Sequence, residues 1–312
     1  MHRMRKLAIL LLISSIFHSS ANYGQSLAAG NPSLSDAEQG YFSDKELAFS
    51  LTYQNSYSNK FYNEDKVYNG LVNIRNAYSN YIEFKTTYGV TPKISTSMEL
   101  GYFLNKTINY QDSSYNGYGL GDLAIYLKYR LISSKTAKFM LLPAIGIKLP
   151  IGVFDQTIGT TKLPLMLQPS SGNFKYNVSI YMLKILNDKL SIASMCFYEY
   201  APLIDSKNFY YKYGDQWKLS FFAKYKFSEN FSTNLQFRFE NKDKENKEFE
   251  KIIEYSGYKI VIASPQISYI FGNNWQISAY ADLPIYQYYN GIQLAQNYSF
   301  SLKLLKKFDF KF

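Results

Sequence analysis

The sequence predicts an all-β protein, namely an antiparallel transmembrane β-barrel of about 12 strands with short periplasmic turns and long extracellular loops. Three observations lead to this prediction. The chain begins with an export signal, apolar and polar residues alternate with a period of two from Lys45 onward, and the last strand ends on the aromatic residue Phe312.

The first 21 residues have the organisation of a secretory signal peptide. Basic residues precede an apolar run from Leu7 to Phe17, and Ser19 and Ala21 provide the small-x-small pattern for cleavage. Residues 22–44 are rich in Ser, Asn, Gly and Ala and show no period. We therefore expect a signal peptide over residues 1–21, a flexible periplasmic leader over residues 22–44, and the barrel over residues 45–312.

The composition is polar but strongly aromatic. Aromatic residues make up 18% of the chain, with 31 Tyr and 23 Phe, and the mean hydropathy is -0.25. No segment after the signal peptide has the roughly 18 consecutive apolar residues of a membrane-spanning helix, so a helical membrane protein is excluded. Aromatic girdles at the two membrane interfaces would account for the rings.

The charge balance is basic. Subtracting the three basic residues of the signal peptide from the net charge of +10 leaves +7. We expect outer-membrane lipid, lipopolysaccharide and anionic small-molecule solutes as the counterparts of this charge. Nucleic acid is not expected, because an exported protein rarely meets it and the lysines are scattered along the strands.

The alternation predicts strands with one apolar and one polar face. In the first strand Leu47, Phe49, Leu51 and Tyr53 alternate with Ala48, Ser50, Thr52 and Gln54, and the pattern recurs over residues 122–131, 217–227 and 234–240. Short turns are expected near residues 91–93, 133–137, 187–189, 228–230 and 272–274. Longer loops are expected near residues 59–69, 107–117, 153–170, 203–213, 243–255 and 286–296. Short turns and longer loops alternate along the chain, as they do in outer-membrane barrels.

The closing segment resembles the C-terminal recognition strand of outer-membrane proteins. Phe312 ends the chain, and Phe310 and Phe308 precede it at intervals of two residues. The resemblance implies that the barrel-assembly machinery reads these three residues as its signal during biogenesis. The alternative is the edge strand of a soluble β-sandwich, but an edge strand this apolar would invite aggregation in water.

The polar face of the strands predicts which charges point into the lumen. The candidates for lining a pore are Asp122, Lys128, Arg130, Lys148, Lys218, Lys224, Arg238, Glu240, Asp282 and Lys303. The same face carries Glu83, Lys85, Glu99, Lys175, Glu199 and Lys226. Two interpretations stay open. Either these charges pair across strands and fill a narrow barrel, or basic rings line a mildly anion-preferring pore.

A glycine-rich pattern resembles one family of outer-membrane barrels. Gly119-Leu120-Gly121-Asp122 opens one strand, and Lys148-Leu149-Pro150-Ile151-Gly152 ends the next. The family is named for transporters associated with the meta-cleavage pathway of phenol degradation. From the residues themselves, the glycines allow a sharp loop-to-strand transition, Pro150 stops the ladder, and Asp122 faces inward as an ion-pair partner or as part of a constriction.

Catalysis is not expected, and neither is a cofactor or a metal. The only histidines, His2 and His18, lie in the predicted signal peptide, which excludes His-activated nucleophiles and His-ligated metals from the exported protein. Nothing in the sequence brings the carboxylate pairs Glu83 with Glu99 or Asp282 with Glu240 together. The single cysteine, Cys196, shares a face with apolar residues and is expected to face lipid.

Two function classes follow from these observations. The first is a passive outer-membrane channel or transporter for small molecules, either apolar and aromatic or mildly anionic. The second is a non-transporting structural or surface-interaction barrel that acts through its extracellular loops. Aromatic loop residues near 115–118, 209–211 and 286–289 are candidates either for an entrance that stacks on ligands or for the outer girdle. The mixed charges of residues 241–251 are a solvated loop or a contact to lipopolysaccharide.

Overall fold

The computed structural model describes residues 45–206, 209–247 and 251–310. The predicted signal peptide, the predicted leader over residues 22–44 and Phe312 lie outside these residues. No helix in the described part is long and apolar enough to cross a membrane.

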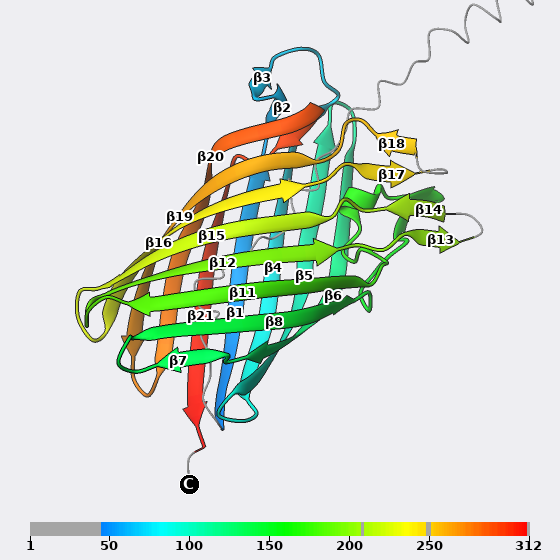
Figure 1. Cartoon of the computed structure of the whole chain (residues 1–312). Helices are drawn as coiled ribbons and strands as arrows, with labels where there is room; N and C mark the ends of the chain where they lie inside the picture. Colours follow the sequence, from blue (N-terminus) through cyan, green and yellow to red (C-terminus); the bar gives the residue numbers. More distant parts are fainter. Residues whose placement is uncertain (1–44, 207–208, 248–250, 311–312) are drawn as a thin grey trace, which may run out of the picture.

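Twelve antiparallel strands close into a barrel (Figure 1). In order around the barrel they are β1 (Glu46–Ser58), β4 (Ile74–Gly89), β5 (Ile94–Tyr110), β6 (Ser114–Tyr129), β8 (Phe139–Leu149), β11 (Lys175–Ile185), β12 (Leu190–Tyr200), β15 (Gln216–Lys226), β16 (Phe231–Lys242), β19 (Tyr258–Phe271), β20 (Trp275–Ala295) and β21 (Tyr298–Asp309). Each strand pairs with the next, and β21 returns to β1. The predicted fold class and strand number are confirmed.

Shorter elements decorate the extracellular end and one turn. They are β2 (Lys60–Glu64), β3 (Lys66–Tyr68), β7 (Ile132–Ser134), β9 (Thr157–Ile158), β10 (Thr161–Lys162), the 3₁₀ turn η2 (Leu165–Leu167), β13 (Ile204–Ser206), β14 (Phe209–Lys212), β17 (Glu245–Lys247) and β18 (Lys251–Ile253). Strands β13, β14, β17 and β18 form a separate four-stranded sheet beyond the extracellular ends of β12, β15 and β16, at the right of Figure 1.

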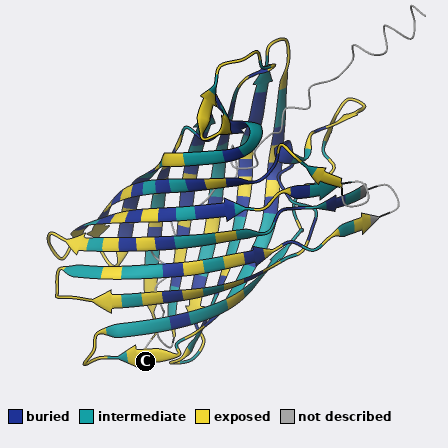
Figure 2. Cartoon of the chain, turned by 45° about the horizontal axis from the view of Figure 1, so that its top comes forward, coloured by how far each residue is buried: buried dark blue, intermediate teal, exposed yellow. Residues whose placement is uncertain are grey.

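Burial is inverted relative to a soluble protein. In β1 the polar Thr52 is 2% exposed while its apolar neighbour Leu51 is 51% exposed, and Figure 2 shows the same stripes around the barrel. In a closed sheet every strand has a neighbour on both sides, so no backbone N–H or C=O group is left unpaired in the hydrocarbon. A barrel with an apolar outer face is therefore stable in a membrane. The period-two prediction is therefore confirmed, with the apolar face outward.

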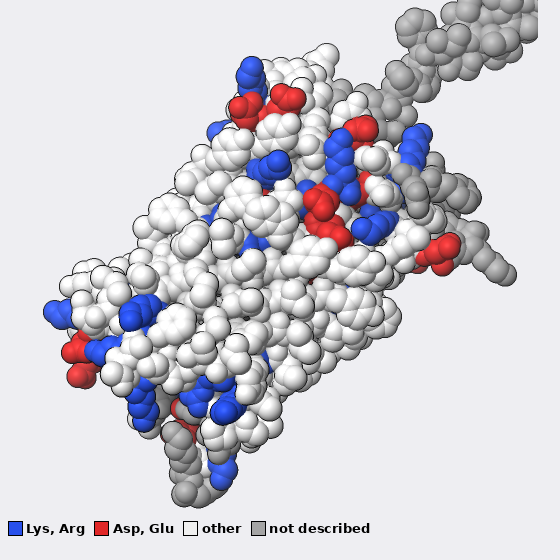
Figure 3. Space-filling view, in the orientation of Figure 1, with Lys and Arg blue, Asp and Glu red and all other residues white. Residues whose placement is uncertain are grey.

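Aromatic rings gather toward both ends of the apolar outer face. Phe49 packs against Phe84 and Phe308 on the neighbouring strands, with ring centroids 5.8 Å and 6.0 Å apart. At the other end of the same strands Tyr57 stacks on Tyr298 at 5.8 Å. Figure 3 shows charged side chains collected at the two ends of the barrel and an outer band without them in between. This arrangement matches two membrane interfaces.

The five predicted short turns are confirmed, and the described ends of the chain lie beside them. Two of the six predicted loops are wrong. Residues near 107–117 continue β5 and β6 up to a turn at 111–113, and residues 286–296 mostly continue β20. Polar strands that extend the barrel into water need no apolar face, so in the sequence they look like loops. Pairing of β20 with β2 and β19 keeps that segment extended.

The lipid-facing position of Leu51 gives a direct test of the inverted burial. We expect Leu51→Lys to lower the free energy of unfolding in phospholipid vesicles by about 2–4 kcal/mol, because the ammonium group would lie near the membrane midplane. Val67 in β3 is equally exposed but belongs to the extracellular hairpin. Val67→Lys is the matched control, with an expected change within about 0.5 kcal/mol. Equal losses in both variants would contradict the membrane placement.

Candidate functional site

The segment between β8 and β11, residues 150–174, folds across the extracellular mouth, and we call it the strap. Its Leu163, Met166 and Leu167 are buried in a cluster with residues of the surrounding strands, among them Phe61 of β2 and Leu294 of β20. Strand β20 lies across the barrel from β8 in the strand order. The strap therefore reaches the opposite wall and places an apolar cluster in the mouth.

Glycines of the sequence motif let the strap lie directly on β6. Strand β8 pairs with β6 only from Leu123 to Lys128, so the extracellular half of β6 lacks a strand on that side. The strap replaces the missing strand. Val153 N donates to Leu120 O at 2.8 Å, and the Gln156 amide bonds to both backbone groups of Tyr118. A Cβ on Gly152 would lie 2.2 Å from Leu120 O, so only glycine permits this approach.

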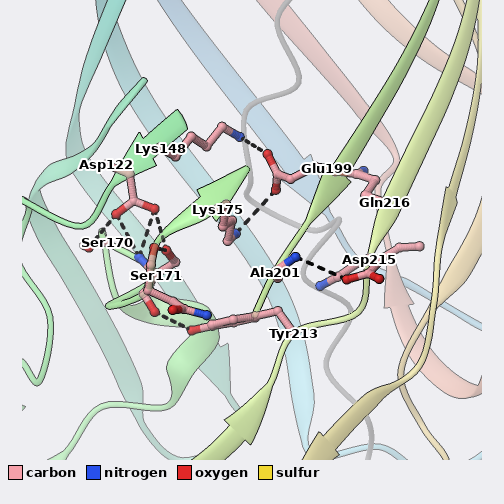
Figure 4. A network of polar contacts seen from close by, with 12 residues as sticks. Asp122, Lys148, Ser170, Ser171, Lys175, Glu199, Ala201, Tyr213, Asp215 and Gln216 are labelled. Carbon is pink, nitrogen blue, oxygen red and sulfur yellow. Dashed lines mark hydrogen bonds and ion pairs between the residues drawn. The ribbon is translucent and has the colours of Figure 1, made fainter. Parts of the chain in front are cut away.

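Asp122 holds the strap from inside the barrel (Figure 4). Its carboxylate accepts hydrogen bonds from Ser170 Oγ at 2.5 Å, from Ser171 Oγ at 2.6 Å and from Ser171 N at 3.1 Å. The sequence predicted that Asp122 faces inward, and it does. Its hydrogen bonds, however, run to a loop far away in the sequence. Asp122 therefore serves as the anchor of the strap.

Tyr213 secures the same segment from the other side. Its hydroxyl donates to Ser171 O at 2.8 Å. Burial raises the pKa of Tyr213, and the carboxylates of Glu245 and Asp122 raise it further. The hydroxyl consequently stays protonated and remains a donor across the physiological pH range.

Beneath the strap lies a cavity of about 260 Å³, which we call the extracellular cavity. Its charged lining residues are Glu83, Glu99, Asp122, Glu199, Glu240, Lys106, Lys148, Lys175, Lys218 and Lys242. Acidic and basic groups are equal in number and several are paired. Lys148 and Lys175 both contact Glu199, at 2.7 Å and 3.6 Å, and Lys85 contacts Glu99 at 2.6 Å. The lining is charge-balanced.

A packed belt lies below this cavity. Leu142, Tyr181, Met195, Ser220 and Arg238 are register partners on five neighbouring strands, and each is at most 7% exposed. On β12 the inward residues in succession are Phe197, Met195 and Ala193. The first lines the extracellular cavity and the last lines a second cavity. The belt therefore separates the two spaces.

Arg238 forms the polar part of the belt. Its Nε donates to Glu240 at 2.6 Å, and its Nη2 donates to Asp282 at 3.0 Å. Asp282 also accepts a hydrogen bond from Ser264 Oγ. A fully buried guanidinium between two carboxylates is held by charge-assisted hydrogen bonds in a fixed geometry.

The second space, the periplasmic cavity, has a volume of about 470 Å³ and opens beside the short turns. Its apolar lining includes Tyr181, Leu183 and Phe222. Its polar lining includes Asn234 and Gln276. Two cavities in series with a packed belt between them are the main feature of the lumen.

Comparison with known proteins supports the sequence resemblance. Residues 87–286 match the family described as "Putative MetA-pathway of phenol degradation". The chain belongs to this family. Among curated proteins, none matches the sequence.

Solved structures agree on the fold of this phenol-degradation family member. The COG4313 outer membrane channel from Pseudomonas putida F1 is 12% identical with a TM-score of 0.71, over 88% of this chain and 100% of that one. The NanC porin is 10% identical with a TM-score of 0.50, over 84% of this chain and 100% of the porin. Together with the apolar outer face, this fold places the chain in the outer membrane of a Gram-negative bacterium.

The ten candidate residues for the lumen of this family member fall into separate places. Asp122, Lys148, Lys218 and Glu240 line the extracellular cavity, Arg238 and Asp282 belong to the belt network, and Lys224 lines the periplasmic cavity. Lys128 is buried on β6, and Lys303 lies on the inward face of β21, opposite Thr52. Arg130 lies elsewhere. Strand β6 ends at Tyr129, and Arg130 instead donates to Pro92 O at the periplasmic turns.

Sequence reasoning missed the apolar part of the belt. Leu142, Tyr181 and Met195 point inward although the inner face of this family member is largely polar, and Phe222 packs against them. The signal was present, because β11 is apolar on both faces from Ile180 to Leu183 and loses its alternation there. The strap donors Ser170 and Ser171 carried no signal, since two serines in a loop are ordinary.

The carboxylates that the sequence offers for acid–base chemistry lie beside basic groups. Glu99 is paired with Lys85, and Arg238 lies between Glu240 and Asp282. Cys196 is exposed on the outer face between apolar neighbours, as predicted.

Proposed function

We propose that this family member is an outer-membrane channel that passes small molecules along its lumen, with the strap and the belt as the two points that control passage. The observation that carries the proposal is the succession of two cavities inside the barrel, which side chains of the belt separate in the part of the chain that the structure describes. Side chains can change rotamer, whereas a wall of hydrogen-bonded strands cannot move aside. No cofactor and no catalytic step are part of the proposal.

Single-channel conductance of the refolded protein in a planar bilayer tests it. We expect small and infrequent openings from the natural sequence and a severalfold larger conductance per opening from Tyr181→Ala combined with Met195→Ala, because both changes remove inward side chains from the belt. The control combines Ile180→Ala with Cys196→Ala, which alters the outward face of the same two strands. Conductance in the control should match the natural protein.

A second candidate function is a non-transporting barrel that acts through its extracellular face. The tightly packed belt favours it, as does the sheet formed by β13, β14, β17 and β18. If neither the natural protein nor the belt variant conducts, the channel proposal fails and this candidate takes its place.

The solute selectivity that we propose is a weak anion preference that arises in the periplasmic half. The extracellular cavity has balanced charge, whereas the lining of the periplasmic cavity has four lysines against three acids, and Lys128 and Lys303 also lie on the inner face. Arg238 contributes little, because two carboxylates neutralise it. Reversal potentials from the same recordings give the selectivity.

We also propose two macromolecular contacts. Lys247 and Lys251 are direct register partners in the extracellular sheet, and like charges in this position repel each other, so an anionic lipopolysaccharide group would relieve the repulsion. Phe308 and Phe310 lie exposed near the periplasmic end with their rings stacked at 6.2 Å, which supports recognition of the last strand by the barrel-assembly machinery.

A further inference from the structure

The periplasmic cavity has one apolar wall with two aromatic rings. Tyr181 and Phe222 are both buried, and their ring centroids lie 6.4 Å apart at an angle of 57°. Leu183 continues this wall toward the periplasm. The ring of a ligand can pack on such a wall edge-to-face or in an offset stack.

A basic and an amide side chain lie directly beside these rings. Lys224 follows Phe222 on the inward face of β15, and Asn234 of β16 is the register partner of Lys224. Asn234 is 5% exposed and lines the cavity, yet its Nδ2 has no hydrogen-bond partner within the described part of the chain. A buried amide donor without a partner is costly, so this atom indicates a missing acceptor.

The other charges around the cavity favour an anionic acceptor. Lysines are the more numerous charged residues in the lining, which contains Lys189, Lys224, Lys226 and Lys307 against Glu46, Asp188 and Asp309. The three acids lie at the mouth, and the side chain of Asp188 is fully exposed beside Lys138. The register partners of Asn234 are Lys224 and Gln266, neither of which is acidic.

We propose that the periplasmic cavity is a binding site for small aromatic carboxylates. The ring of the ligand packs against Phe222 and Tyr181, and its carboxylate accepts hydrogen bonds from Asn234 Nδ2 and Lys224 Nζ. This assignment rests on the proposed channel function, in which the cavity is the last station before the periplasm. An apolar surface beside a basic one would hold such a solute in a single orientation.

Isothermal titration of the detergent-refolded full-length protein tests the site. Benzoate is the probe, with acetate as the charge without a ring and benzyl alcohol as the ring without a charge. We expect benzoate to bind, and Asn234→Leu to weaken its binding about tenfold or more, because a hydrogen bond to a charged group is lost. Phe222→Ala should weaken it about threefold to tenfold. Phe221→Ala, on the lipid-facing side of the same strand, should leave it unchanged.

A second variant keeps the test decisive if Asn234→Leu fails to fold. Asn234→Asp keeps the size of the side chain and should abolish benzoate binding through charge repulsion. The site is rejected if benzoate does not bind, if acetate or benzyl alcohol binds as tightly as benzoate, or if no Asn234 variant changes the affinity. Titration needs no open pore. Conductance without benzoate binding would therefore overturn only this site, whereas benzoate binding to a silent barrel would overturn only the channel.

Discussion

Replacing Arg238 by Met should lower the free energy of unfolding by about 3–5 kcal/mol, the cost of leaving buried charges without their partner. Arg238 is fully buried and bonded to Glu240 and Asp282, which are themselves almost inaccessible. Methionine fills most of the volume but offers no donor. Two carboxylates would then face each other across the belt with no cation between them.

Urea titration in phospholipid vesicles, followed by tryptophan fluorescence, measures this loss. The matched control is the triple variant in which Arg238→Met is combined with Glu240→Gln and Asp282→Asn. It removes all three charges together and should recover most of the stability, since a buried ion network is often no better than neutral groups of the same shape. A loss below about 1 kcal/mol in the single variant would mean that water reaches the carboxylates.

Replacing Asp122 by Ala should release the strap and raise the open probability of the channel on the order of a hundredfold. Its carboxylate accepts hydrogen bonds from Ser170 and Ser171 inside the barrel. Hydrogen bonds to a charged group contribute about 1.5–3 kcal/mol each, and two of them correspond to at least a hundredfold shift in the population of the released strap.

Single-channel recordings of the Asp122→Ala variant measure the open probability. Asp155→Ala is the control within the same strap, because the Asp155 side chain is exposed and its ion pair with Lys162 lies at the surface. Such pairs contribute little, so gating should not change. If Asp122→Ala gates like the natural protein, the apolar cluster around Leu163 and Leu167 holds the strap without the carboxylate.

The barrel itself was predictable from the sequence because its cause is local. Each membrane-spanning residue responds separately to lipid outside or to the lumen inside, so the period of two in β1 or β15 reports its own environment. The same holds for the short turns and for the inward direction of Asp122. The match over residues 87–286 extends the resemblance first seen in the motif around Gly119 to Gly152.

The candidate site was predictable only in part, because its contacts join residues far apart in the chain. Asp122 meets Ser170 and Ser171 only because the strap folds inward, and Arg238 meets Asp282 through strand register. The sequence left open whether the interior charges pair across strands or form basic rings around a pore, and this choice also depends on these long-range pairs. Polar segments such as 286–296 show the same limit, since a strand standing in water and a loop have the same composition.

Sequence alone thus determined that this protein is an exported-type barrel with an apolar exterior, a charged interior and a family motif at one hairpin. Tertiary structure alone decided that the motif anchors a strap and that several interior charges are neutralised in ion pairs. It also decided that a packed belt divides the lumen into two cavities. The physical reason is the distance along the chain over which each effect acts. Solvent polarity acts on one residue at a time, whereas pairing and packing depend on the register of strands that close around a common axis.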